Sequence, residues 1–179
     1  MSTFAKLQNR KGIIFLVGLF LCAAILWYLF FYTETDPEKV ATLETTFSVL
    51  EADGVEFYFN MDWCKVLVYG DVQASETVDS TVDEDCGTRL TGRTGFTSFA
   101  GIDQNIFNRL TETYRSEYRE VEARFVDGKI TYAVFHKDCS FCRTRYVYDP
   151  GYTLPDNIEG ELLHVPINEN WYRVEEDWN

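Results

Sequence analysis

The sequence feature that most constrains the fold is an uncharged apolar run, Gly12–Tyr32. An α-helix of this length, rising about 1.5 Å per residue, spans roughly 30 Å, which is the hydrocarbon thickness of a bilayer. The run is longer than the apolar segment of a secretory signal peptide, and no small-x-small cleavage site follows it. The sequence therefore predicts an uncleaved transmembrane helix over residues 12–32, in contact with the lipid bilayer.

The charges on the two sides of this run predict its orientation. Lys6, Arg10 and Lys11 are the only charged residues before it, and acidic residues follow it closely. Because basic residues favour the cytoplasmic side of a membrane, residues 1–11 are predicted to be a cytoplasmic tail and residues 33–179 an extracytoplasmic domain. The chain has no Asn-x-Ser/Thr sequon, which suits a non-glycosylated compartment. The expected localisation is the cell inner membrane, with a single pass and a periplasmic C-terminal domain.

The composition of the predicted outer domain excludes one class of partner. Residues 33–179 hold all 29 acidic residues and 13 of the 16 basic ones, so their formal net charge is −16. Nucleic acid is bound through Lys and Arg side chains that neutralise phosphates, and a strongly acidic domain repels it. We therefore expect no nucleic-acid partner.

The order of helical and strand patterns predicts an α+β domain built on an antiparallel sheet with about two helices. The first helix is expected to begin at Asp36-Pro37, with Asp36 as the N-cap, and to end at Asp53-Gly54. Three- and four-residue spacings give it an apolar stripe made of Val40, Leu43, Phe47 and Leu50. The second helix is expected to begin at Asp103 and to continue the apolar face Phe107, Leu110, Tyr114 and Tyr118, with Ile102 and Phe107 as a hydrophobic staple.

Strand patterns fill most of the remaining domain. They occur at residues 55–60, 65–69, 120–126, 129–136, 143–148, 162–167 and 171–174, with the last two expected at a sheet edge. Asp127-Gly128 predicts the turn of the clearest hairpin. Residues 70–100 are polar and rich in Gly, Ser, Thr and Asp, and they are predicted to form a mobile loop.

Cysteine spacing predicts disulfides in the outer domain. Cys22 falls in the predicted membrane helix, which leaves Cys64, Cys86, Cys139 and Cys142. An even number of cysteines in an exported domain indicates disulfide bonds. Three pairings are possible, and the favoured one joins Cys64 to Cys86 and Cys139 to Cys142.

A redox pair is the alternative interpretation of Cys139-Ser140-Phe141-Cys142. Such a motif is reactive when its first cysteine lies at a helix N-terminus, which lowers the thiol pKa. Strands are predicted on both sides of this motif, so only nearby basic residues such as His136 and Arg143 would stabilise a thiolate. The alternative function is therefore a membrane-tethered thiol-disulfide oxidoreductase that uses Cys139 and Cys142.

No catalytic residue, cofactor or metal is expected. The single C-x2-C pair lacks the second pair that a zinc site of this type needs. His136 and His164 accompany no HExxH or GxSxG motif, and each is interpreted as a strand residue. Trp171, Tyr172 and Trp178 are the candidates for contact with a protein partner, because aromatic residues often anchor interfaces; packing against the core is the alternative.

A short basic tail, Lys11-Gly12, an unbroken apolar helix, a following helix and an antiparallel sheet are expected in this order along the chain. The pattern resembles a type IV pilin or pseudopilin over the first forty or so residues and in the overall order of elements. In that family the leader is cut after the glycine and a Glu stands five residues beyond, whereas Val17 occupies that place here. The resemblance implies a pilin-like component as a further alternative. The leading expectation is a non-enzymatic membrane protein whose acidic domain binds a protein partner, as an accessory subunit, assembly factor or immunity-type protein.

Overall fold

The computed structural model divides the chain into two compact units, Met1–Thr35 and Asp36–Asn179. It describes residues 36–77, 85–115, 117–139 and 142–177. The predicted cytoplasmic tail and the predicted membrane helix over residues 12–32 both lie outside the described residues. Within those residues, no helix is both long and apolar enough to cross a bilayer.

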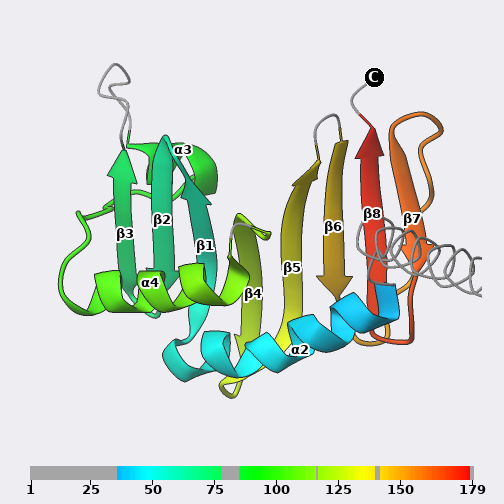
Figure 1. Ribbon diagram of the computed structural model, residues 1–179, viewed down its shortest axis with the longest axis horizontal. Coiled ribbons are helices and arrows are strands. Elements are labelled where there is room, and N and C mark those ends of the chain that lie inside the picture. Colours follow the sequence, from blue (N-terminus) through cyan, green and yellow to red (C-terminus); the bar gives the residue numbers. More distant parts are fainter. Residues whose placement is uncertain (1–35, 78–84, 116, 140–141, 178–179) are drawn as a thin grey trace, which may run out of the picture. The chain divides into compact units, whose positions relative to one another are not determined.

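The second unit is an antiparallel sheet with helices packed on it (Figure 1). The described helices are α2 (Asp36–Asp53), α3 (Cys86–Thr91) and α4 (Ile102–Tyr114). The eight strands are β1 (Val55–Met61), β2 (Cys64–Tyr69), β3 (Val72–Thr77), β4 (Glu120–Val126), β5 (Lys129–Cys139), β6 (Cys142–Tyr148), β7 (Leu162–Pro166) and β8 (Trp171–Asp177). This architecture confirms the predicted antiparallel α+β domain and adds a third helix to the two that were expected.

The strand order across the sheet is β3-β2-β1-β4-β5-β6-β8-β7. Two segments of the chain, α2-β1-β2-β3 and α4-β4-β5-β6, have the same order of elements and are separated by α3; they meet in the sheet where β1 pairs with β4. α2 contacts β5 of the second segment, and α4 contacts β1 of the first, so the two helices tie the segments together. β8 lies between β6 and β7, which corrects the prediction that both of the last strands are edges.

The main core lies between the sheet and the layer formed by α2 and α4 (Figure 1). The predicted stripe of α2 is confirmed, since Val40, Leu43 and Leu50 are buried and Phe47 packs against the cluster. Each fully buried side chain of this size contributes about 1.5–3 kcal/mol. Gly54, with φ of 64°, ends α2 in the left-handed conformation that its sequence predicted.

The interval predicted as a mobile loop, residues 70–100, contains β3 and α3, so the prediction of an irregular segment is wrong for these two elements. β3 pairs with β2 along its whole length despite having few apolar residues. α3 is capped by the Asp85 side chain, which accepts a hydrogen bond from Gly87 N at 2.6 Å. Residues 78–84 of this interval lie outside the described part of the chain.

The ends of α4 also differ from the prediction. Gly101 is the N-cap, and Asp103 stands in the first turn. Ile102 is 69% exposed, so the predicted hydrophobic staple with Phe107 does not form. The helix ends at Tyr114, and Tyr118 is buried from the connection to β4 rather than from the helix.

Candidate functional site

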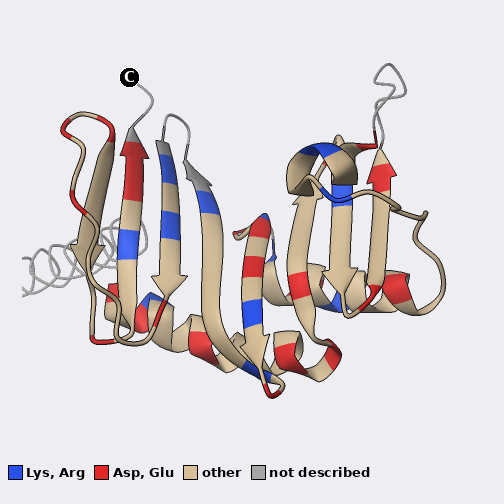
Figure 2. Cartoon of the chain, turned by 180° about the vertical axis from the view of Figure 1, so that it is seen from behind, with Lys and Arg blue, Asp and Glu red and all other residues tan. Residues whose placement is uncertain are grey.

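The sheet face opposite α2 and α4 is only partly covered (Figure 2). α3 lies against β2 and β3, where a second apolar cluster surrounds the disulfide between Cys64 and Cys86. No described helix lies over the rest of this face, which β4, β5, β6 and β8 form. Charged residues of both signs lie on these strands, next to a small apolar cluster made of Val134, Val147 and Val174.

A β-bulge sets which side chains of the β4–β5 hairpin share this face. The turn at Asp127 and Gly128 pairs Val126 with Lys129, as the sequence predicts. The register then shifts at Arg124, because β5 contributes one extra residue. Beyond the shift, Glu120 lies opposite His136; an unshifted hairpin would place Phe135 there. The bulge therefore brings a histidine, and not a phenylalanine, beside the carboxylates of β4.

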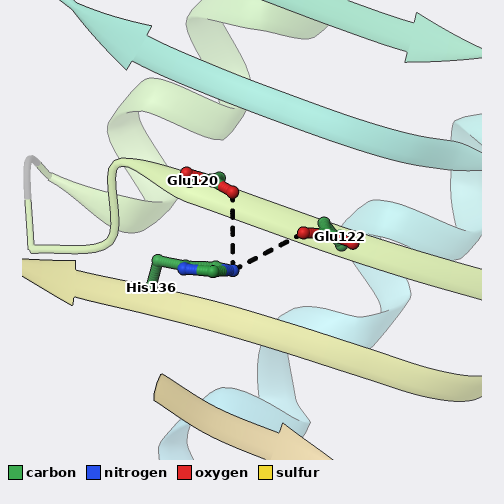
Figure 3. Close-up of side chains that lie close together, drawn as sticks. All are labelled: Glu120, Glu122 and His136. Carbon is green, nitrogen blue, oxygen red and sulfur yellow. Dashed lines mark ion pairs between the residues drawn. The ribbon is translucent and has the colours of Figure 1, made fainter. Parts of the chain in front are cut away.

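Glu120, Glu122 and His136 form a compact cluster at this position (Figure 3). The imidazole Nε2 points toward both carboxylates and lies 3.5 Å from Glu120 Oε1 and 3.6 Å from Glu122 Oε1. His136 is only 7% exposed, and neither of its ring nitrogens has a hydrogen-bond partner. One imidazole nitrogen and two carboxylate oxygens, all within 4.8 Å of one another, are a donor set that could hold a metal ion.

A groove of about 530 Å³ runs beside this cluster, between β4 and the end of α3. Its apolar lining comes from Phe57, Leu90, Phe125 and Tyr132. Its charged lining comes from Glu56, Arg93, Glu120, Glu122 and Arg124. This volume lies in the range of binding sites, and the lining combines several charged side chains with a smaller apolar part.

The charged groups of the groove are paired with their neighbours. Arg93 donates to Glu56 at 2.9 Å, and the guanidinium of Arg124 stacks over the Tyr132 ring at 4.7 Å. His136 lowers the pKa of the Glu122 carboxyl, burial opposes this effect, and Arg124 adds to the lowering. Burial raises the pKa of the Tyr132 phenol. The groove thus presents an ionised Glu122 carboxylate and a neutral Tyr132 phenol near neutral pH.

The structure confirms one of the two predicted disulfides. Cys64 and Cys86 are bonded, and the bond joins the start of β2 to the first turn of α3. Cys139 and Cys142 lie opposite each other in the β5–β6 register, and their side chains lie outside the described part of the structure. Cys139 is the last residue of β5 and Cys142 the first of β6, so neither cysteine lies at the N-terminus of a described helix, the position that usually lowers the thiol pKa of a redox pair.

The predicted partner-binding aromatics do not form one surface. Trp171 is fully buried among Phe47, Phe135 and Tyr148, and its Nε1 donates to Glu44 at 2.8 Å. This tryptophan belongs to the core and is not available to a partner. Tyr172 is half-buried against Tyr152 on the other face, and Trp178 lies outside the described residues.

Sequence reasoning missed the grouping of Glu120, Glu122 and His136. The alternation of Glu120, Val121 and Glu122 indicated that the two glutamates share a face. The register of the hairpin was needed to place His136 beside them, and no residue of β5 marks the bulge that sets this register. Comparison with known proteins finds no matching family model, no similar curated protein and no similar solved structure.

Proposed function

We propose that residues 36–179 form a non-enzymatic binding domain for a protein partner, held at the inner membrane by the helix predicted over residues 12–32. The domain lies on the periplasmic side in this proposal, as the charge distribution of the sequence predicts. Its partner is a second membrane or periplasmic protein, which the chain serves as an accessory, assembly or immunity-type subunit.

The observation that carries this proposal is the groove between α3 and β4. Its apolar walls, Phe57, Leu90 and Phe125, can receive an apolar side chain of the partner. Buried aromatic and aliphatic anchors of this kind supply most of the binding energy at protein interfaces. The charged side chains around these walls form a polar rim, which is the usual anatomy of an interface.

The charge of the domain favours a basic partner segment. Three glutamates and two arginines line the groove, and the domain around it is strongly acidic. Such a field accelerates encounter with a positively charged surface and repels an acidic one. We therefore expect the segment that enters the groove to combine an apolar anchor with Lys or Arg.

Site-specific photo-crosslinking in native membranes tests this proposal. A photoreactive amino acid replaces Thr91 on the groove wall in the full-length chain. The matched control replaces Thr45, an exposed threonine on α2 and thus on the opposite side of the sheet. We expect a single discrete adduct from position 91 and none from position 45, and we expect Leu90→Glu to abolish that adduct.

Two results would overturn the groove as the binding site. The first is the same pattern of adducts from positions 91 and 45, which would indicate unspecific contact. The second is an adduct at position 91 whose yield is unchanged by Leu90→Glu, provided that this variant retains the unfolding midpoint of the parent chain.

A further inference from the structure

We propose that Glu120, Glu122 and His136 bind a divalent transition-metal ion of the zinc class. The proposal concerns the cluster on β4 and β5 and does not depend on a protein partner in the neighbouring groove. It replaces the expectation from the sequence that the chain has no metal site.

The separations between the donor atoms fit a metal ion better than a hydrogen bond. A charge-assisted bond between an imidazolium and a carboxylate is about 2.7–2.9 Å long. His136 Nε2 instead stands 3.5 Å from one carboxylate and 3.6 Å from the other, nearly equidistant from both. Two ligands that each lie about 2.0–2.2 Å from a tetrahedral Zn²⁺ ion are about 3.3–3.6 Å apart. The spacing is thus that of two edges of a zinc tetrahedron.

The burial of His136 is the second, independent observation. The residue is 7% exposed, and its Nε2 points at the two carboxylates without a hydrogen-bond partner (Figure 3). A buried polar nitrogen without a hydrogen-bond partner destabilises the folded state. A metal ion bound between the nitrogen and the two carboxylates would satisfy it, and the neutral imidazole is the form that ligates metals.

The charge of the cluster itself favours a divalent cation. With a neutral imidazole, the cluster carries the charge of two carboxylates, which a divalent ion balances. Two guanidinium groups lie near Glu122 and partly offset this negative charge: Arg124, which stacks on Tyr132, and Arg145 of β6, which is opposite His136 in the sheet and 3.9 Å from Glu176. The acidity of the whole domain raises the local concentration of cations further.

The donor set also selects the class of metal. An imidazole nitrogen with carboxylate oxygens suits zinc and its neighbours in the first transition row, whereas Ca²⁺ and Mg²⁺ prefer oxygen ligands alone. Three protein ligands leave one tetrahedral position open, as in many zinc sites that accept water or a further ligand. Glu122, whose side chain is 46% exposed, connects the cluster to solvent at the groove.

Titration with Co²⁺ and Zn²⁺ tests the site directly. The full-length chain, purified in detergent and stripped with a chelator, is titrated with Co²⁺ while visible absorption is followed, and Zn²⁺ is then added in competition. The background carries Cys22→Ser, Cys139→Ser and Cys142→Ser, so that thiolates outside the Cys64–Cys86 disulfide cannot supply the signal. We expect one Co²⁺ per chain with tetrahedral absorption, displacement by Zn²⁺, and no displacement by equal Ca²⁺.

Ligand variants and a matched histidine control complete the test. Loss of an outer-shell partner alone costs a metal site about 10–100-fold in affinity, so His136→Gln and Glu122→Gln should each weaken Zn²⁺ binding by at least about tenfold. Glu122 is half-exposed, so its variant is expected to fold even if the histidine variant does not. His164→Gln, which changes the other histidine, should leave the affinity unchanged.

Three outcomes would refute the metal site: substoichiometric Co²⁺ binding by the parent chain, equal affinity of the Glu122→Gln and His164→Gln variants, or equal competition by Ca²⁺. Each of them would leave the cluster as a pair of carboxylates beside a buried histidine.

Discussion

Tyr146 shows how one buried side chain joins the first turn of α2 to the sheet. Its ring is 2% exposed in the main core, and its hydroxyl donates to Asp36 at 3.0 Å and accepts from Lys39 at 3.3 Å. Arg173 of β8 also contacts the Asp36 carboxylate. Asp36 was expected to be the N-cap, but it is the first residue of α2. Its carboxylate contacts two strands, through Tyr146 of β6 and Arg173 of β8. A buried polar group of this kind stabilises only while its partners remain.

Removal of the Tyr146 hydroxyl should destabilise the domain. Tyr146→Phe keeps the ring in the core and takes one donor from the Asp36 carboxylate, so we expect a loss of about 1–2 kcal/mol in the free energy of unfolding. Urea unfolding of the full chain in detergent, followed by tryptophan fluorescence, measures it. Tyr152→Phe is the control, because that hydroxyl donates to Asn168 O on an exposed loop. An equal loss in both variants would contradict the role assigned to Tyr146.

At the scale of the elements, the stability of α3 depends on its contacts with the rest of the domain more than on its own helix propensity. It has six residues, of which one is glycine and two are the β-branched Thr88 and Thr91, so its intrinsic helix propensity is low. The Asp85 cap, the Cys64–Cys86 disulfide and the packing of Leu90 hold it against the sheet. Leu90 and Thr91 of α3 in turn line one wall of the groove.

Loss of the Cys64–Cys86 disulfide should therefore lower the stability of the domain and loosen the α3 wall of the groove. The bond closes a loop with a sequence separation of 22 residues, and the chain-entropy model gives about 3 kcal/mol for such a loop. We expect Cys64→Ala with Cys86→Ala to lower the free energy of unfolding by at least that amount and to increase proteolysis near Thr91. The predicted Cys139–Cys142 bond would close a much shorter loop, so Cys139→Ala with Cys142→Ala should cost less; equal costs would contradict the assignment.

The elements that the sequence predicted well are those with strong local patterns. The α2 stripe, the glycine that ends it and the Asp127-Gly128 hairpin follow from periodicity and turn chemistry alone. β3 and α3 carry no such pattern, because pairing with β2 and the disulfide hold them in place. No residue pattern in β5 predicts its bulge either, and this bulge places His136 beside the two glutamates. The candidate metal site therefore required the structure.

At the scale of the whole molecule, tyrosines pack on both faces of the sheet. Burial or an adjacent carboxylate raises the phenol pKa of seven of them: Tyr58, Tyr69, Tyr114, Tyr132, Tyr146, Tyr148 and Tyr172. Tyr69 on β2 is a clear case, because its hydroxyl donates to Asp103 of α4 at 2.6 Å, and this bond raises its pKa to about 12. The folded domain thus retains phenolic protons that the unfolded chain releases.

This difference predicts an alkaline limit to stability. A phenol with a raised pKa contributes stability that is fully present below its unfolded value near pH 10 and is lost as the pH rises through the folded value, about 12 for Tyr69. The free energy of unfolding should therefore fall steeply between about pH 10 and 12. Tyrosinate absorbance of the folded and the urea-unfolded chain, titrated in parallel, measures the difference, and Tyr69→Phe should reduce it. Coincident titration curves for the two states would contradict the prediction, because the phenols would then retain no protons on folding.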